Sequence, residues 1–186
     1  RMADIFRTLP LDTYTGLDLA ASVLPLAASA MGQAPFPCRW QQGDLLDWAE
    51  RPNPSADGSA PERVDVIHSA FAIHHLSDSQ KIQFLRGARQ RIEVDGLLLW
   101  VDVFQDEDDS RETYLDRYID RVRHWPALDT QQIKAIVEHM HDCDWPAQRG
   151  TIETIAAQEG WRWRWAWRGS YGSEALAVLQ PCSLKN

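Results

Sequence analysis

Acidic and imidazole side chains follow several short apolar runs, and they are the residues best placed to do chemistry. Asp18 follows YTGL, Asp44 follows RWQQ and a glycine, and Asp102 follows LLLWV, while His74 and His75 come shortly after VDVIH. In an open parallel sheet, ligands bind beyond the carboxyl ends of the strands. A carboxylate there can accept both hydroxyl groups of a ribose. The alternative for each acid is a solvated side chain at a strand end.

The segment HMHDCD, from His139 to Asp144, also contains residue types that bind metals. Its histidines are two positions apart and cannot share one helix face. No second cluster in the sequence completes a site, so we expect no metal. The three cysteines, Cys38, Cys143 and Cys182, are odd in number and lack Cys-x-x-Cys spacing. That usage is typical of a reduced, cytoplasmic protein.

The elements that must position these residues alternate between strand and helix. Strands are expected at Tyr14 to Leu19, Phe36 to Gln41, Val64 to His68 and Leu97 to Phe104. Helices are expected at Met2 to Leu9, Ala20 to Met31 and from Ser77 to about Ile92. A capping box of Ser77 and Gln80 begins the last helix, and Asp95-Gly96 is expected to form the turn after it. This alternation predicts an α/β fold with a parallel sheet.

After Phe104 the pattern changes, and residues 106–148 are expected to form a helical cap inserted over the sheet. Tyr114, Tyr118 and Trp125 lie on one face of a predicted helix, where they either wall a substrate pocket or form core. Helices are also expected at Gln131 to His141, after Thr130 as a cap, and at Ile152 to Glu159, before Gly160. The whole chain, residues 1–186, is expected to be a single domain.

Near the end of the sequence, WRWRWAWRG alternates tryptophan with arginine. Strict alternation from Trp161 to Trp167 predicts a strand with all four tryptophans on one face. Glu174 to Leu179 is expected to return as its antiparallel partner. A role in binding membranes or nucleic acids is the alternative, but little else in the sequence supports it. An exposed edge at this strand is expected to allow pairing with a second subunit, as a homodimer.

Composition limits the partners of the protein. The formal net charge of the 186 residues is −8, so the chain as a whole repels phosphate backbones. We therefore expect no nucleic-acid partner. No uninterrupted apolar stretch approaches the roughly 20 residues that a membrane span requires. We expect a cytoplasmic protein without a membrane partner.

Four segments carry a resemblance to a known family. They are YTGLDLAASVLPLA, GDLLDW, VDVIHSAFAIHHL and LRGARQRIEVDGLLLWVDVF, in this order between Tyr14 and Phe104. Together they resemble the segments that follow the glycine-rich loop in class I S-adenosylmethionine-dependent methyltransferases that act on small molecules. The resemblance implies a Rossmann-like, seven-stranded α/β sheet. It also implies methyl transfer from S-adenosylmethionine to a small-molecule acceptor.

For the adenosine part of the cofactor, the resemblance implies five residues in the first quarter of the chain. Asp18 binds the ribose hydroxyl groups, with Leu19 beside it, and Val23 lies near the adenine. Asp44 accepts a hydrogen bond from the adenine amino group, and Leu45 contributes its backbone.

For the methionine part, the resemblance implies that Ser69, Ala70 and Phe71 line the sulfonium side of the site. It places His74 and His75 at the mouth facing the substrate. Both are candidate general bases, because a neutral imidazole accepts protons near pH 7. The alternative is that one of them caps or packs against the helix that begins at Asp78.

The sequence departs from the family pattern in its first part. The family's first strand and G-x-G-x-G loop should precede the helix with Phe6, yet the sequence begins at Arg1. We expect that the biological chain extends upstream, or that this strand comes from elsewhere. Two other functions stay open: a noncatalytic binding or regulatory module of the same fold, and another nucleotide-dependent α/β enzyme such as a dehydrogenase.

Overall fold

The computed structural model describes residues 2–50 and 63–182. The chain divides into two compact units, Arg1–Asn53 and Pro54–Asn186. The elements of the first unit are α1 (Met2–Phe6), β1 (Tyr14–Asp18), α2 (Leu24–Met31), β2 (Cys38–Gln42) and α3 (Leu45–Glu50). Strands β1 and β2 pair in parallel, as the alternation of strand and helix predicted.

Local sequence explains how the first unit packs. Helix α2 begins at Leu24 with Pro25 in its first turn, a position where the missing N–H costs nothing. Gly16 in β1 faces Trp40 in β2, and a Cβ atom on this glycine would lie 2.5 Å from the indole ring. The absence of a side chain at Gly16 therefore lets the tryptophan lie across the strand. Tyr14, two residues earlier on β1, also packs against that ring, with centroids 5.5 Å apart.

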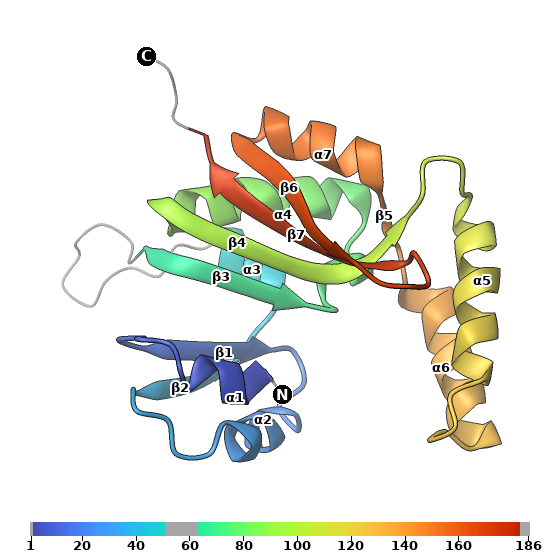
Figure 1. Cartoon of the computed structure of the whole chain (residues 1–186), viewed down its shortest axis with the longest axis horizontal. Coiled ribbons are helices and arrows are strands. Elements are labelled where there is room, and N and C mark those ends of the chain that lie inside the picture. The colour runs from blue at the N-terminus through green and yellow to red at the C-terminus, as the bar shows by residue number, and fades with distance from the viewer. Residues whose placement is uncertain (1, 51–62, 183–186) are drawn as a thin grey trace. The chain divides into compact units, whose positions relative to one another are not determined.

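The second unit is built on a five-stranded mixed sheet (Figure 1). Its strands are β3 (Val64–Ala70), β4 (Ile92–Gln105), β5 (Ala147–Gln148), β6 (Trp161–Arg168) and β7 (Glu174–Pro181). The order is β3-β4-β7-β6, with β3 and β4 parallel and β7 antiparallel to both neighbours. The two-residue strand β5 pairs in parallel with the end of β4. Strand β6 lies at the sheet edge, and β7 is the antiparallel partner predicted from the sequence.

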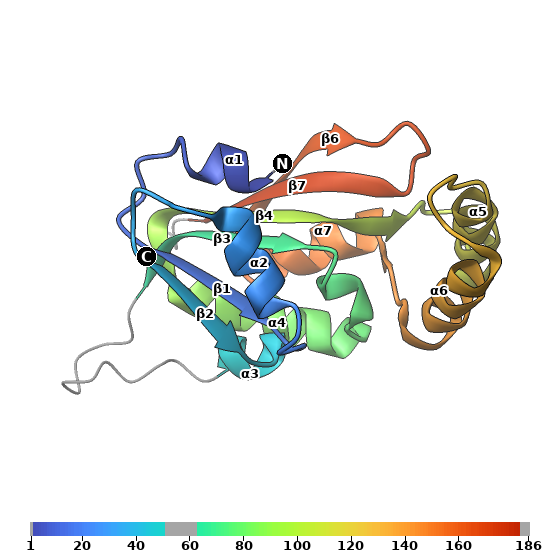
Figure 2. The same cartoon turned by 90° about the horizontal axis from the view of Figure 1, so that it is seen from below.

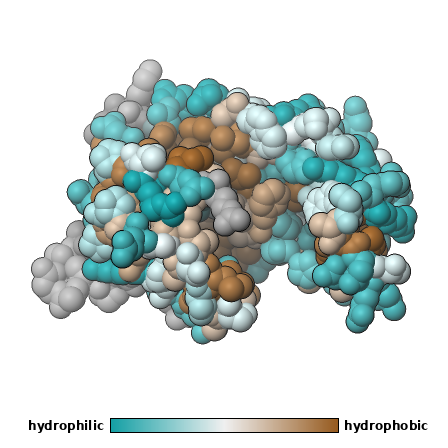
Figure 3. All heavy atoms as spheres, turned by 60° about the horizontal axis from the view of Figure 1, so that its bottom comes forward, coloured by the Kyte–Doolittle hydropathy of each residue, from teal (hydrophilic) through white to brown (hydrophobic). Residues whose placement is uncertain are grey.

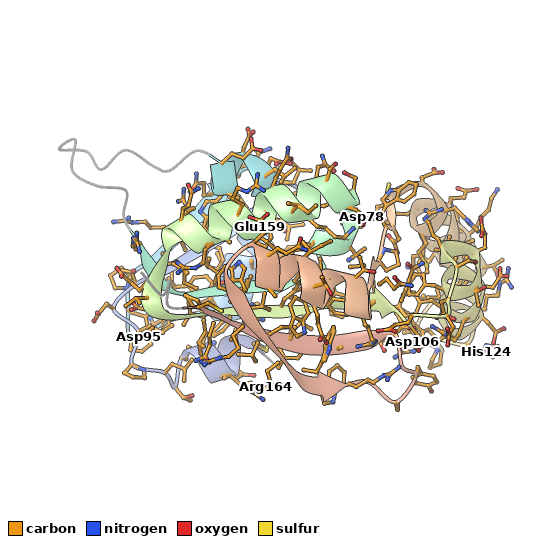
Figure 4. All side chains as sticks on the ribbon, turned by 90° about the horizontal axis from the view of Figure 1, so that it is seen from above. Asp78, Asp95, Asp106, His124, Glu159 and Arg164 are labelled. Atoms are coloured by element: carbon orange, nitrogen blue, oxygen red, sulfur yellow. The ribbon has the colours of Figure 1, made fainter. Side chains whose placement is uncertain are left out.

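Two helices, α4 (Asp78–Arg91) and α7 (Arg149–Gln158), lie side by side on one face of this sheet (Figures 1 and 4). Arg86 of α4 donates two hydrogen bonds to Glu159, labelled in Figure 4, at 2.9 and 2.8 Å. The predicted capping box of Ser77 and Gln80 is present. Gly160 follows α7 with φ of +83°, the left-handed conformation expected of it.

Helices α5 (Arg111–Arg123) and α6 (Thr130–Cys143) stand beyond the end of β4 (Figures 1 and 2). Their shared core consists of Val103, Tyr114, Leu115, Ile119, Val122 and Met140, and Tyr118 packs against it. On the face that Figure 3 shows, the pair is mostly hydrophilic. Of the predicted aromatic stripe, Tyr114 is fully buried core, whereas Trp125 is 38% exposed.

The described parts of the chain contain no helix that is both long enough and apolar enough to cross a membrane.

Two local predictions were wrong. The side chain that caps α6 belongs to Asp129, which accepts from the backbone of Gln132 at 2.8 Å in a full capping box, and not to Thr130. Asp95-Gly96 forms no turn, because β4 begins at Ile92 directly after α4. Pairing with β3 is irregular there, and a Cβ atom on Gly96 would lie 2.7 Å from the carbonyl oxygen of Asp65. The glycine is thus needed for close approach of the two strands.

The prediction that four tryptophans share one strand face was correct for three of them. The register of β6 against β7 shifts between Trp165 and Trp167, so Ala166 is an extra residue. A bulge of this kind reverses the faces that follow it. Trp165 is paired with Ala177, but Trp167 is paired with Leu176, the next residue along β7. Accordingly Trp161 is 1% exposed and Trp167 is 53% exposed.

This difference gives a test of the bulge. We expect Trp161→Ala to lower the free energy of unfolding by about 3–5 kcal/mol, because it removes a buried indole. It also removes the hydrogen bond from Trp161 Nε1 to the carbonyl of Leu85, which is 3.0 Å long. Trp167→Ala is the matched control and should change stability by no more than about 0.5 kcal/mol. Urea unfolding followed by circular dichroism measures both, and equal losses would contradict the bulge.

Candidate functional site

Two acidic residues follow adjacent strand ends at one edge of the first unit. Asp18 is the last residue of β1 and pairs with Gln42, the last residue of β2, so Asp18 and Asp44 follow the same edge of the parallel pair. The backbone N–H of Gly43 donates to the carbonyl of Asp18 at 3.0 Å, which ties the two strand ends together. The fold therefore brings together the two acids to which the family resemblance assigned the ribose and adenine contacts.

Each of these acids also has a structural task. Asp18 Oδ1 accepts a hydrogen bond from the backbone N–H of Ala20 at 2.8 Å. Asp44 Oδ1 accepts from the backbone of Leu46 and Asp47 at 2.7 and 3.1 Å and so begins α3. All these bonds use one oxygen of the carboxylate. A carboxylate has two oxygens, so capping and ligand binding are compatible.

The three apolar residues assigned to the adenosine part of the cofactor follow the same strand ends. Leu19 is 69% exposed directly after β1, and Val23 is 39% exposed at the start of α2. Leu45 is the first residue of α3 and is partly exposed. Exposed aliphatic side chains beside two acids are the composition that an adenosine site requires, an apolar surface with a few polar groups.

In the second unit, β3 and β4 are parallel and end at the same edge of the sheet. Ser69 and Ala70 pair with Trp100 and Val101 of β4. Phe71 follows with φ of +51°, a conformation that is rare outside glycine and occurs often at ligand sites. Its backbone N–H donates to the carbonyl of Val101 at 2.9 Å, which holds the turn. Ser69 Oγ is buried and has no hydrogen-bond partner among the described residues.

His74 and Asp102 form a buried pair at this edge. His74 lies in the short helix η1 (Ile73–His75), and its Nδ1 is 2.5 Å from Asp102 Oδ1. Asp102 is fully buried in β4 and also accepts from the backbone N–H groups of Ile73 and His74, both at 3.1 Å. The carboxylate thus fixes both the turn and the ring of His74. The sequence left open that one of the two histidines packs in front of α4 and is not a base. His74, which is 7% exposed, is the histidine that packs in this way.

A second acid reaches the same histidines from α6. Asp144 follows the C-terminus of α6 and is 3% exposed. Its Oδ1 lies 3.5 Å from His74 Nε2 and 3.6 Å from His75 Nδ1. The ring of His139, also from α6, lies edge-on to His75 with centroids 5.2 Å apart. Sequence reasoning did not connect these two acids with His74, because no spacing rule links them to it. Asp102 was recognised only as an acid at a strand end, and Asp144 only as part of HMHDCD.

The two histidines are in opposite electrostatic situations. Burial alone lowers the pKa of His74, but the hydrogen bond to Asp102 and the negative charges of Asp102 and Asp144 outweigh it and raise the pKa to about 9. For His75, burial and then the positive charge of His74 lower the pKa below its ordinary value. At neutral pH in the metal-free protein, His74 is a cation between two acids, whereas His75 is neutral.

This difference predicts a pH dependence of stability. The pKa of His74 is raised from 6.5 to about 9 on folding, so its stabilisation is complete below about pH 6.5 and is lost as pH rises through about 9. We expect the wild-type protein to lose more stability across this window than His74→Gln, which has no ionisable group there. Urea unfolding at several pH values, with chelator present, measures the difference. His124→Gln, at the far end of α5, is the control; a His74→Gln slope equal to that of the wild type would contradict the prediction.

The sequence was also compared with known proteins. No family model matches it, and no curated protein matches it. Many solved structures do match. Three of them are described next, and each matches with a probability of 1.00.

The CurJ carbon methyltransferase matches with a TM-score of 0.63 at 17% identity, over 98% of this chain and 45% of that chain. A pericyclic reaction enzyme matches with a TM-score of 0.63 at 12% identity, over 97% of this chain and 39% of that chain. Human N-acetylserotonin methyltransferase in complex with S-adenosylmethionine matches with a TM-score of 0.55 at 15% identity, over 91% and 40%. This chain spans less than half the length of each. These likenesses show that it has the mixed α/β fold of class I S-adenosylmethionine-dependent methyltransferases.

Proposed function

We propose that this protein transfers a methyl group from S-adenosylmethionine to a small-molecule acceptor. The observation that carries the proposal is the pair of acids, Asp18 and Asp44, at the carboxyl ends of adjacent parallel strands. In doubly wound folds, this is where a nucleoside is held, with an acid on the ribose hydroxyl groups. The fold shared with methyltransferases supports the same assignment.

Within each unit, the residues present suit the part of the cofactor that the family resemblance assigns to them. Asp18 and Asp44 would hold the ribose and the adenine amino group, with Leu19 and Val23 as apolar contacts and Leu45 contributing its backbone. Ser69, Ala70 and Phe71 would line the methionine part. The unpaired, buried Oγ of Ser69 supports this, because a buried hydroxyl without a partner costs free energy that a ligand can recover. The cofactor supplies a methyl group already activated by the sulfonium, so the protein has chiefly to bind, orient and exclude water.

Of the two histidines, His75 is the one that suits proton transfer from an acceptor. Both ring nitrogens of His74 face buried carboxylates, Nδ1 at 2.5 Å and Nε2 at 3.5 Å, which leaves no nitrogen for a substrate. The side chain of His75 is 38% exposed. Its Nδ1 donates to the carbonyl of Cys143 at 3.2 Å, and in that tautomer Nε2 carries the lone pair. His74 is then a positioning residue, which affects the reaction only through its neighbour His75.

The helical cap would complete the acceptor side. Trp145 follows α6, is 47% exposed, and donates its backbone N–H to the carbonyl of His74 at 2.7 Å. The guanidinium of Arg111 lies 4.1 Å from the centre of its indole ring and holds it in place. An exposed aromatic surface beside His75 suits an apolar or aromatic acceptor.

Cofactor binding tests the carrying observation. We expect S-adenosylhomocysteine to bind the longest natural chain that contains this sequence, measured by calorimetric titration. Asp18→Ala should weaken binding about 10- to 100-fold, the cost of a hydrogen bond to a charged group. Asp12→Ala, an exposed acid just before β1, is the matched control. Tight binding that Asp18→Ala leaves unchanged would refute the assignment, and preferential binding of NAD would favour a dehydrogenase.

Turnover tests the role of His75. With an acceptor that must lose a proton, His75→Gln should lower kcat by about 100-fold or more at saturating cofactor, since that is the usual contribution of a general base. Affinity for S-adenosylhomocysteine should stay the same. His124→Gln should change neither quantity. If the wild type and the variant both bind the cofactor but neither transfers a methyl group to any acceptor, the proposal of an enzyme is wrong. That result would favour a noncatalytic binding module.

A further inference from the structure

His74, His75 and Asp144 form a compact group of ligand atoms within the second unit. We propose that His74 Nε2, His75 Nδ1 and Asp144 Oδ1 form a binding site for one divalent transition-metal ion, of the class of Zn²⁺. Spacing alone does not predict this site, because no second cluster accompanies HMHDCD in the sequence. The fold supplies that cluster by bringing Asp144 of this segment against the two histidines of η1. The proposal does not depend on methyl transfer.

The distances fit one ion. The ligand atoms of the three residues all lie within 4.8 Å of one another. Asp144 Oδ1 is 3.5 Å from His74 Nε2 and 3.6 Å from His75 Nδ1. Around Zn²⁺, with bonds of about 2.0–2.1 Å, tetrahedral ligands are about 3.3–3.4 Å apart. Two edges of the group therefore already have nearly the required length, and a small rotation of the exposed His75 ring closes the third.

Asp144 gives independent support. Its residue is 3% exposed, and its Oδ1 accepts no hydrogen bond from any residue that the structure describes. Buried carboxylate oxygens are normally paired, or they coordinate a metal. The backbone that carries this side chain is held by Arg111, which donates to the carbonyl groups of Asp144 and His141 at 2.8 and 2.6 Å. This oxygen, which accepts no hydrogen bond, thus faces one nitrogen of each of the two imidazole rings.

Asp102 completes an arrangement that is typical of metal-bound histidine. Metal-ligating histidines usually donate their other ring N–H to a carboxylate, which fixes the tautomer and the ring orientation. His74 has this partner, since its Nδ1 is 2.5 Å from Asp102 Oδ1. Asp102 is itself held by Trp100, whose Nε1 donates to Oδ2 at 2.9 Å. His74 Nε2 is therefore aimed at Asp144 by a chain of fixed hydrogen bonds.

Charge favours the same conclusion. Asp102 and Asp144 are both buried, and the histidine between them can carry only one positive charge. The next cation that acts on Asp102 is Lys81, whose ammonium is hydrogen-bonded to Leu76 and Asp78 instead. With neutral histidines, a divalent ion balances the two carboxylates fully. Two imidazoles and one carboxylate suit Zn²⁺, Co²⁺ or Fe²⁺ better than Mg²⁺ or Ca²⁺, which prefer oxygen ligands only.

Metal binding and the proposed base role of His75 exclude each other. Coordination through Nδ1 breaks the hydrogen bond to Cys143 and places the proton on Nε2. The metal also takes the place of the proton on His74 Nε2. A fourth coordination position would be left for water.

The test uses Co²⁺ as a spectroscopic probe in the full 186-residue chain, first stripped with chelator. We expect saturable 1:1 binding at pH 7.5, with the visible absorption of low-symmetry Co²⁺ and competition by Zn²⁺. Asp144→Asn and His75→Gln should each weaken binding at least 10-fold. Asp102→Asn should weaken it about 10- to 100-fold, the usual effect of losing the carboxylate behind a histidine ligand. His141→Gln, exposed on the same helix, is the matched control and should bind like the wild type.

Three results would overturn the proposal. They are no binding of Co²⁺ at millimolar concentration, equal affinity in Asp144→Asn and the wild type, and a thiolate-to-cobalt charge-transfer band, which would assign the metal to Cys143. Circular dichroism shows whether each variant is folded. Should Asp144→Asn fail to fold, His75→Gln decides, because its exposed ring can be replaced without opening the core. Since the readout is binding alone, failure here leaves the proposed methyl transfer untouched.

Discussion

The buried carboxylate of Asp102 is the interaction on which the site depends. It is fully buried in the central strand β4 and accepts hydrogen bonds from Ile73, His74, Trp100 and Val103. A buried charge is tolerated only when its oxygens are satisfied in this way. The bonds join β4 to the turn after β3, so one side chain sets the path of η1 and the orientation of its first histidine. His75 is placed by the same turn.

Helices α5 and α6 extend this arrangement from outside the sheet. Their core packs on Val103, the residue after Asp102, so the hydrophobic contact and the polar site share one strand. Arg111 of α5 then holds the C-terminal carbonyls of α6, and Asp144 follows directly. The position of the second buried acid thus depends on packing between two helices that are distant from the histidines in sequence.

Periodicity predicted most elements because each depends on short-range patterns. The apolar runs of β1, β3 and β4, the capping box at Ser77 and the glycine after α7 all follow from local sequence. The errors have long-range causes. The strand β4 runs through Asp95-Gly96 because β3 lies against it, and the tryptophan pattern of β6 is interrupted by its register with β7. Likewise His74 was a candidate from its position, but its pairing with Asp102 and Asp144 depends on tertiary contacts that no spacing reveals.

The bulge at Ala166 also bears on how the sheet meets other protein chains. An edge strand with regular, unpaired backbone groups is a template for adding strands without limit. In β6 the regular part ends at Trp165, and Arg162 and Arg164 lie on the face opposite the buried tryptophans. A strand that docked on this edge would find about five residues in register before the bulge, with charged side chains along it. The bulge and the arginines thus limit strand addition along this edge, which protects the sheet against fibrous aggregation.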